Sequence, residues 1–243
     1  MRYLGSKRCI ASEIVPIIES HIGEGTTFID MCCGGCSIVS EVNASNKIAV
    51  DSNEYIIALW KHLQTKQLEG HVCDAVPYDV SREQYNSIRR SCIDKDGRFP
   101  DYLIGYVSTC CSFGGAYWGG YAAYNPKKNE NHCHEAYNGL MKQVKAFKHL
   151  DTTQFVCSSF EKFEVPPRSV IYADPPYFGT KKYKDDFNHE LFWDWARLMT
   201  KAGHKVFISE YDAPSDFKVI WQKTRKETLS QHTRTVTEKL FTL

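Results

Sequence analysis

The stretch IYADPPYFG, residues 171–179, joins an apolar run to an acid, two prolines and an aromatic ring. Each proline lacks a backbone N–H and disfavours helical geometry at the residue before it, so Asp-Pro-Pro-Tyr cannot extend a helix. Proline is equally unsuited to the interior of a sheet ladder. The stretch therefore predicts a strand over 169–173 that ends in a rigid turn, and a purely structural turn is its simplest interpretation.

Short runs rich in β-branched residues recur on both sides of this turn and predict further strands. The expected strands lie at 27–31, 47–51, 154–157, 169–173, 205–209 and 238–243. A segment long enough for a helix separates the first two of them. Parallel neighbours need such crossover segments, so the spacing favours a parallel sheet.

Two segments between the expected strands have the apolar spacing of helices. In 54–64, the side chains of Ile57, Trp60 and Leu63 lie on one helical face. Asn188 is suited to cap the N-terminus of a second helix. We expect one face of that helix to pack on the core through a stripe of four residues, Leu191, Trp195, Leu198 and Ala202.

Strands that alternate with helices indicate an α/β fold with a doubly wound, mostly parallel sheet. Residues 61–150 interrupt this alternation, with few strand signals and the Gly- and aromatic-rich stretch SFGGAYWGGYAAYNP at 112–126. The interruption is too long for one crossover connection. We therefore expect residues 1–60 and 151–243 to form one domain, with 61–150 as an inserted, mainly helical lobe.

The composition is that of an ordinary globular protein. The chain has 243 residues, of which 42% are hydrophobic and 24% charged, and its formal net charge is +1. A protein with so little net charge contacts nucleic acid through local basic patches. No apolar signal-peptide region follows the basic residues at the N-terminus, and no apolar run reaches membrane-spanning length. We expect a soluble, cytoplasmic protein without membrane contact.

The ten cysteines raise the possibility of disulfides or a metal site. Without a secretion signal a disulfide framework is not expected. Cys33 and Cys36 form one C-x-x-C, but no second such pair accompanies it, and His132-Cys133-His134 lacks the usual ligand spacing. We expect reduced structural thiols and no metal, with a redox pair at Cys33 and Cys36 as a weaker alternative.

Three of the expected strands are followed by, or end in, an acid. Asp30 and Asp51 belong to the first two strands and Asp174 follows a later one. In doubly wound sheets ligands bind outside the carboxyl ends of the strands, and an acid after the second strand suits the paired hydroxyls of a ribose. Gly34 and Gly35 allow the backbone to approach a ligand closely. One such acid often only caps the next helix, but three in order indicate a ligand site.

These motifs, in this order, resemble the Dam-type adenine-specific DNA methyltransferases. RYLGSK (2–7) is similar to the family's N-terminal cofactor motif, FIDMCCGGCS (28–37) to its Gly-rich motif and IAVDSN (48–53) to its ribose-binding acid. DPPY (174–177) resembles the catalytic motif, and VFISEYDAP and TRTVTEKLF resemble the closing strands. The resemblance covers nearly the whole chain.

The resemblance implies a Rossmann-like methyltransferase sheet, S-adenosylmethionine as cofactor, double-stranded DNA as partner, and 61–150 as the target-recognition domain. The catalytic residues that it implies are Asp174, Pro175, Pro176 and Tyr177. The cofactor-binding residues that it implies are Tyr3, Lys7, Asp30, Cys32, Gly34, Gly35, Asp51, Ser52, Ser159, Phe160 and Asp174. Cys32 and Cys36 depart from the pattern, because they stand where relatives usually carry an aromatic and a small residue.

The chemistry explains why such a residue set is needed. The lone pair of an exocyclic adenine amine is delocalised into the ring, so the amine is a poor nucleophile. Asp174 and the carbonyl of Pro175 are suited to accept hydrogen bonds from its two N–H groups. These bonds would localise the nitrogen lone pair toward a methyl donor. Tyr177 would stack on the base, which must first leave the duplex. The methyl of S-adenosylmethionine is already activated, so in-line displacement needs no metal.

A basic run after the catalytic motif, together with the inserted lobe, is expected to contact DNA. The expected residues are Lys181, Lys182, Tyr183, Lys184, Tyr124 and Asn125. A ring among three positive charges suits a DNA backbone, although a Lys-rich run is also typical of a solvated face. Tyr117, Trp118 and Tyr121 either brace DNA or pack the interior of the lobe.

Two alternatives stay open beside N6-adenine methylation. The first is methyl transfer to another planar amine, such as cytosine, an RNA base or a protein amide. The second is an inactive DNA-binding homologue. The sequence does not reveal the target site, and the oligomeric state is open between a monomer and a weak dimer.

Overall fold

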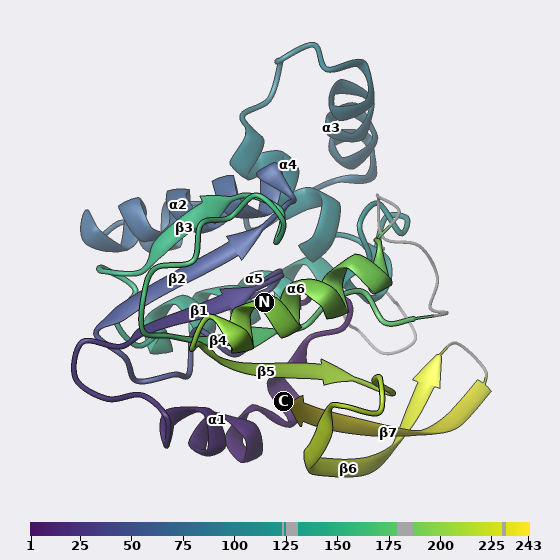
Figure 1. Ribbon diagram of the computed structural model, residues 1–243. Coiled ribbons are helices and arrows are strands. Elements are labelled where there is room, and N and C mark those ends of the chain that lie inside the picture. Colours follow the sequence, from purple (N-terminus) through teal and green to yellow (C-terminus); the bar gives the residue numbers. More distant parts are fainter. Residues whose placement is uncertain (123, 125–130, 179–186, 230–231) are drawn as a thin grey trace.

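A mixed sheet forms the centre of the computed structural model (Figure 1). The structure describes residues 1–122, 124, 131–178, 187–229 and 232–243. The strands are β1 (Thr27–Met31), β2 (Asn46–Asp51), β3 (Gln154–Cys157), β4 (Ser169–Ala173), β5 (Lys205–Glu210), β6 (Lys218–Leu229) and β7 (His232–Thr242). The helices are α1 (Ala11–Glu19), α2 (Glu54–Leu68), α3 (Arg82–Asp94), α4 (Asp101–Cys110), α5 (His132–Ala146) and α6 (His189–Lys201). Short 3-10 helices cover Lys7–Cys9, Val72–Asp74 and Phe113–Gly115.

The strands run in the order β3-β2-β1-β4-β5-β7-β6. β1 pairs in parallel with β2 on one side and with β4 on the other, and β3 and β5 extend these pairs in parallel. β7 runs antiparallel to both β5 and β6. The strand order reverses at β1, so the expected doubly wound, mostly parallel sheet is confirmed.

The strands of the parallel part were predictable, whereas the antiparallel edge was not. The expected ranges agree with β1 to β5 within one residue, but β7 begins at His232 rather than at residue 238. β6 was missed because its sequence, KVIWQKTRKETL, is rich in charge and shows no strict alternation. Its Val219 and Ile220 are exposed, as is tolerated in an edge strand that buries little surface.

The segment between β1 and β2 contains turns where a helix was expected. The values of φ at Cys32, Gly34 and Cys36 are 65°, 42° and 52°, in the left-handed region that a right-handed helix excludes. The buried carboxylate of Asp30 accepts a hydrogen bond from Val39 N, at 3.0 Å, and closes this loop back onto β1. The two residues that depart from the family pattern, Cys32 and Cys36, are thus positions of unusual backbone geometry.

Helices cover both faces of the sheet, with α6 in front in Figure 1. The buried residues of α1, α2, α4 and α5 share one core with Phe28 and Tyr172, which point to one face of the sheet. Ile29 and Ile171 point to the other face and pack with α6. Successive residues of a strand therefore pack into different cores, one on each face of the sheet, because side chains alternate along a strand.

The helix after Asn188 forms as predicted, but the stripe assigned to it was wrong. Asn188 caps α6, since its Oδ1 accepts a hydrogen bond from Leu191 N at 3.0 Å. The residues that α6 buries are Phe192, Trp195 and Ala196. Of the four residues of the expected stripe (Leu191, Trp195, Leu198 and Ala202), only Trp195 is buried. Phe192, Trp195 and Ala196 have the helical spacing i, i+3, i+4, and this stripe, with its two large rings, is the one that packs on the sheet.

Residues 61–150 are mainly helical, but they do not begin at a break in the structure. The expected boundary after residue 60 falls inside α2, where Trp60 and Leu63 are both fully buried. Helices α4 and α5 share the core of α2, and α3 projects from the rest of the chain (Figure 1). Among the described helices, none combines the length and the apolar character needed to cross a membrane.

Helix α4 contacts α2 through Gly105. A Cβ placed on Gly105 would lie 2.1 Å from the carbonyl oxygen of Tyr55 and 2.8 Å from its carbonyl carbon. Both are backbone atoms of α2, so the clash cannot be relieved by rotating a side chain. The close approach of the two helices therefore requires glycine at this position.

We predict that Gly105→Ala lowers the free energy of unfolding by about 1–3 kcal/mol, the usual cost of overpacking a core. The matched control is Gly139→Ala in α5, where an added Cβ meets no atom within 4 Å. This control should raise stability by about 0.5–1 kcal/mol, because glycine is unfavourable inside a helix. Urea unfolding midpoints measure both changes, and equal effects of the two substitutions would contradict the packing account.

Candidate functional site

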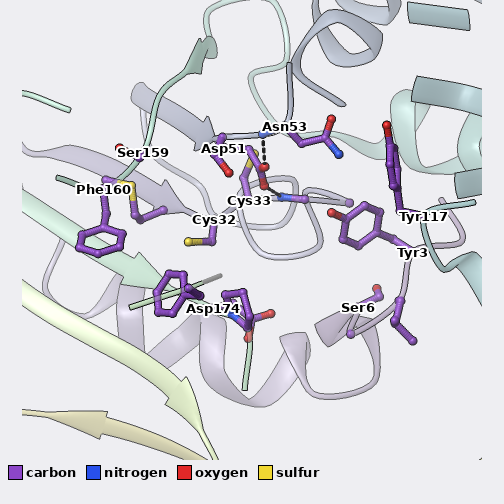
Figure 2. Close-up of a pocket in the computed structure, with 18 of the residues that line it drawn as sticks. Tyr3, Ser6, Cys32, Cys33, Asp51, Asn53, Tyr117, Ser159, Phe160 and Asp174 are labelled. Atoms are coloured by element: carbon purple, nitrogen blue, oxygen red, sulfur yellow. Dashed lines mark hydrogen bonds between the residues drawn. The ribbon is translucent and has the colours of Figure 1, made fainter. Parts of the chain in front are cut away.

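A cavity of about 400 Å³ lies across the carboxyl ends of β1, β2, β3 and β4, where the strand order reverses (Figure 2). Tyr3 and Tyr117 lie at one end of it and Ser159 and Phe160 at the other. The predicted site residues that line it are Tyr3, Cys32, Gly34, Gly35, Asp51, Ser52, Ser159, Phe160, Asp174 and Pro176. Segments far apart in sequence therefore meet where doubly wound sheets bind ligands.

Asp51 holds two loops together at the end of β2. Its Oδ2 accepts a hydrogen bond from Gly34 N and its Oδ1 accepts one from Asn53 N, both at 2.8 Å. Burial raises the pKa of Asp51, while the two backbone N–H groups oppose the rise. A carboxylate oxygen has two lone pairs, so each retains an acceptor site that can face a ligand in the cavity.

The N-terminal segment forms one wall of the cavity, because glycines give it room. A Cβ on Gly34 would lie 2.5 Å from Cε1 of Tyr3, and a Cβ on Gly35 would lie 2.8 Å from Cβ of Tyr3. On the other side, a Cβ on Gly115 would lie 2.8 Å from Tyr3 N, and Leu4 N donates a hydrogen bond to Gly115 O at 3.0 Å. Tyr3 is therefore held between the Gly-rich loop and the segment 61–150.

At the opposite end, a buried polar atom faces the cavity. The hydroxyl of Ser159 is buried and has no hydrogen-bond partner within the described part of the chain. Such an orphaned group is costly unless a ligand or water satisfies it. Phe160 lines the cavity and also belongs to the core of α6, with its ring 5.4 Å from that of Phe192. Both residues fit an aromatic ligand group with polar edges.

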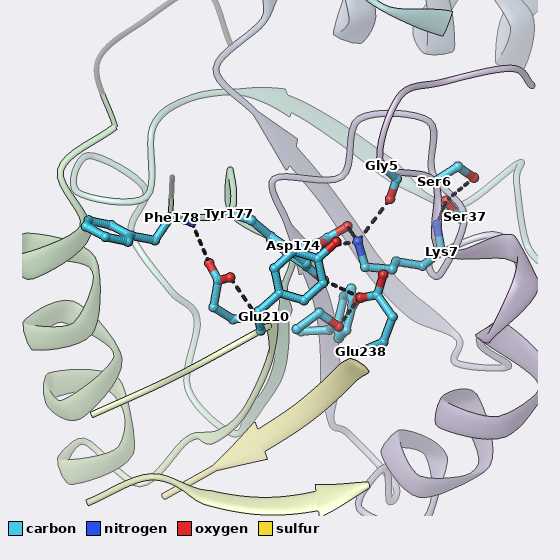
Figure 3. A network of polar contacts seen from close by, with 12 residues as sticks. Gly5, Ser6, Lys7, Ser37, Asp174, Tyr177, Phe178, Glu210 and Glu238 are labelled. Carbon is cyan, nitrogen blue, oxygen red and sulfur yellow. Dashed lines mark hydrogen bonds and ion pairs between the residues drawn. The ribbon is translucent and has the colours of Figure 1, made fainter. Parts of the chain in front are cut away.

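Lys7 contacts the acid of the Asp-Pro-Pro-Tyr turn, a position that the sequence did not predict. Its Nζ lies 2.9 Å from Oδ2 and 2.8 Å from Oδ1 of Asp174, and it also donates to Gly5 O at 2.9 Å (Figure 3). Lys7 does not line the cavity among the residues described there. Burial raises the pKa of Asp174 to about 6, and the charge of Lys7 opposes this rise.

Two buried glutamates surround the same turn, and neither was predicted. Glu238 accepts a hydrogen bond from the hydroxyl of Tyr177 at 2.8 Å. Glu210 accepts from Tyr211 N at 2.8 Å and from Phe178 N at 3.3 Å. Burial raises the pKa of Glu210 to about 7, against the effect of these backbone donors. Both lie in the stretches that resemble the family's closing strands, but that resemblance gave neither acid a role, and their strands pair only in the fold.

The remaining predicted residues are placed in several ways. Pro175 and Tyr177 belong to the turn but do not line the described cavity. Asp30 also lies off the lining; it is buried against Val39, and burial raises its pKa well above the ordinary value. Tyr124 is exposed. The predicted DNA-contacting residues Asn125, Lys181, Lys182, Tyr183 and Lys184 lie outside the described residues.

Several further residues line the cavity that were not among the predicted site residues, although some of them lie within the quoted cofactor motifs. They are Leu4, Gly5, Ser6, Met31, Cys33, Ser37, Asn53, Gly115, Ala116, Ser158, Glu161, Phe187 and Asn188. Tyr117, considered for DNA or for packing, also lines the cavity. Gly115 and Tyr117 carry no motif, and only their distance to Tyr3 in the fold brings them to the site. The inserted segment thus supplies part of the cavity wall.

The cysteines form no disulfide in the structure. Burial raises the pKa of the Cys33 and Cys36 thiols, which makes both poor nucleophiles and weakens the interpretation as a redox pair. Within the described ranges no cluster of three or more His, Cys, Asp or Glu side chains is placed to hold a metal ion.

The doubly wound sheet and a cavity with an acid after its second strand define the class of Rossmann-like enzymes that bind a nucleotide-containing cofactor. More narrowly, the chain belongs to the D12 class N6 adenine-specific DNA methyltransferase family, whose sequence profile matches residues 3–229. The resemblance drawn from the motifs is thereby confirmed.

Two curated relatives of this chain are a methyltransferase and a methylase, in agreement with the family. The type II methyltransferase M.FokI of Planomicrobium okeanokoites is 28% identical over an alignment of 222 residues that covers 82% of this chain and 31% of that protein. The modification methylase StsI of Streptococcus sanguinis is 24% identical over 207 residues, covering 80% of this chain and 31% of that protein. The chain thus spans about a third of the length of these curated relatives.

Two solved structures align over nearly the whole chain, but only weakly. HI0767 from Haemophilus influenzae has a TM-score of 0.34 at 11% identity and covers 97% of this chain and 94% of that one. SMU.472, in complex with SAH, has a TM-score of 0.35 at 11% identity and covers 99% of this chain and 53% of that one. Scores this low carry no part of the assignment.

We predict that Lys7→Met raises the pKa of Asp174 above its value of about 6, because the substitution removes the cation that opposes the effect of burial. Carboxyl ¹³C chemical shifts of labelled aspartate, followed over a pH titration, measure this change. Lys162→Met, at an exposed lysine after β3, is the control and should leave the titration of Asp174 unchanged. A pKa that stays the same in Lys7→Met would show that the ion pair does not set it.

Proposed function

We propose that this chain transfers a methyl group from S-adenosylmethionine to the N6 amine of adenine in a specific sequence of double-stranded DNA. The observation that carries the proposal is the placement of Asp174, which lines the cavity beside the rigid Pro-Pro-Tyr turn and pairs with Lys7. Family membership supports the same reaction. The named relatives are methyltransferases or methylases, which agrees with this reaction class.

The cavity fits the three parts of the cofactor. The orphaned hydroxyl of Ser159 and the ring of Phe160 suit an adenine at one end. The carboxylate of Asp51 suits the ribose hydroxyls in the middle. The wall formed by Tyr3 and the Gly-rich loop suits the amino-acid end. When bound, S-adenosylmethionine supplies a methyl group that its sulfonium already activates.

Asp174 is the residue that prepares the amine. Its carboxylate and the carbonyl of Pro175 accept hydrogen bonds from the two N–H groups of the target amine, which directs the nitrogen lone pair toward the methyl donor. The prolines restrict the turn, so the acceptors are in place before the base arrives. With a pKa of about 6, Asp174 is mostly ionised above neutral pH, in part through the charge of Lys7.

Tyr177 provides a flat surface against which the base stacks. A base inside a duplex cannot reach the turn, so the target nucleotide rotates out of the helix before transfer. The segment 61–150 is the part of the chain proposed to read the DNA sequence. The run from Lys181 to Lys184 is proposed to contact the phosphate backbone, where lysine binds through charge alone.

The first experiment is incubation with methyl-labelled S-adenosylmethionine and unmethylated duplex DNA, followed by nucleoside chromatography. Label in N6-methyladenine supports the proposal. Label in methylcytosine would keep the cofactor but move the reaction to another planar amine. Cofactor binding without label in DNA would point to RNA or protein as substrate, and the absence of both would leave an inactive homologue.

We predict that Asp174→Ala lowers the single-turnover methylation rate at least about 100-fold, the scale found when a preorganised polar group is removed. DNA affinity in a gel-shift assay should stay nearly the same, because the carboxylate acts on the base after it has left the duplex. Asp151→Ala, at an exposed acid between α5 and β3, is the control and should retain full activity. A parallel loss of DNA affinity in Asp174→Ala would contradict the assigned role.

A second prediction concerns the cofactor. Asp51→Asn should weaken binding of S-adenosylhomocysteine about tenfold or more in calorimetry, because an amide offers one acceptor oxygen where the carboxylate offers two. Asp74→Asn, at an exposed acid that is not part of the cavity lining, should bind as the unmodified protein does. Equal affinities of the two variants would remove Asp51 from the cofactor site.

A further inference from the structure

We infer that Glu238 is a positioning residue of this reaction, which holds the ring of Tyr177 in the orientation that receives the flipped base. The inference rests on the proposed function, since a stacked base is what the ring would hold. Glu238 lies on β7, more than sixty residues after the turn, in a part of the sheet that contributes nothing to the lining of the described cavity.

The contacts of Glu238 link the turn to the hairpin of β6 and β7. Its Oε2 accepts a hydrogen bond from the hydroxyl of Tyr177 at 2.8 Å (Figure 3). Its Oε1 accepts one from Nη2 of Arg225 at 2.7 Å. Arg225 belongs to the neighbouring strand β6. The side chain of Glu238 is only 3% exposed. Burying a carboxylate costs free energy, and these charged and hydroxyl donors offset that cost.

The ring of Tyr177 is held by a hydrogen bond at its hydroxyl, by a second ring and by a cation near its centroid. Glu238 accepts a hydrogen bond from its hydroxyl, and the ring of Tyr211 packs against it in a T-shaped arrangement, with centroids 4.5 Å apart and an angle of 80° between planes. Nζ of Lys7 lies 4.6 Å from the ring centroid. A tyrosine side chain has two main torsions; the hydrogen bond restrains the position of the hydroxyl, and the packed ring of Tyr211 restrains the ring plane. The plane is therefore set before a base arrives, which saves ordering entropy during the reaction.

The geometry predicts which substitutions disturb the ring. Glu238→Leu keeps most of the volume but removes both acceptors. Glu238→Gln keeps an oxygen for Arg225 and an amide that can donate to the oxygen of Tyr177, because a phenol oxygen also accepts. Tyr177→Phe keeps the ring and removes only the hydroxyl. If Glu238 acts through this hydroxyl, Glu238→Leu and Tyr177→Phe impair the same step.

The test is steady-state methylation of duplex DNA by the full chain at saturating S-adenosylmethionine, with thermal unfolding to verify that each variant folds. Glu238→Leu and Tyr177→Phe should each lower kcat about tenfold with little change in KM for DNA. Glu238→Gln, which keeps both contacts, should retain most of the kcat of the unmodified chain. The double variant should be no slower than Glu238→Leu alone, since non-additivity marks a shared interaction. Thr237→Val removes the neighbouring Thr224–Thr237 hydroxyl contact of 3.0 Å in the same hairpin and should retain full kcat.

The outcomes separate the inference from the proposed function. An unmodified chain that transfers no methyl group overturns the proposed function and the inference with it. An active chain whose kcat survives both Glu238→Leu and Tyr177→Phe overturns the inference alone. Fully additive losses, or a loss in Thr237→Val equal to that in Glu238→Leu, would also overturn it, because they assign the effect to the stability of the hairpin. If Glu238→Leu fails to fold, the other two variants decide the question. Tyr177→Phe should still lower kcat about tenfold and Glu238→Gln should retain most of it, and an unchanged kcat in Tyr177→Phe overturns the inference.

Discussion

The ion pair between Lys7 and Asp174 joins the N-terminal segment to the end of β4, and the site is organised around it. The two groups lie 2.8–2.9 Å apart in a buried environment, so the charge of each compensates the other. Once residue 7 is fixed there, the residues before it pass over the Gly-rich loop. Tyr3 can occupy that position only because Gly34 and Gly35 have no side chains. One pair of charges thereby determines the path of a whole cavity wall.

The parallel half of the sheet could be predicted because its information is local. Strands β1 to β5 are short apolar runs, and buried parallel strands need little more than such a run and a crossover. The acids at their ends were found for the same reason, since a strand end and an acid are adjacent in sequence. The prediction of Asp51 and Asp174 at one cavity follows directly from that adjacency.

What the sequence concealed depends on contacts between distant segments. Glu210 and Glu238 are single acids in strands, and nothing near them reveals that both surround the turn at residues 174–177. The stripe on α6 was misassigned because its sequence contains two apolar stripes at helical spacing. Which of them is buried depends on how the helix packs on the sheet. β6 was missed since an exposed edge strand needs no apolar alternation.

The position of Gly115 against the backbone of Tyr3 limits which part of the segment 61–150 can be exchanged without disturbing the cavity. A chimera that replaced residues 61–150 as a block would cut α2 between Trp60 and Leu63, within its buried face. It would also replace the glycine on which the N-terminal segment lies. A transplant that leaves the cavity intact has to begin beyond Leu68 and to keep a glycine at position 115. The part of the segment that meets neither restriction is the projecting part around α3 (Figure 1).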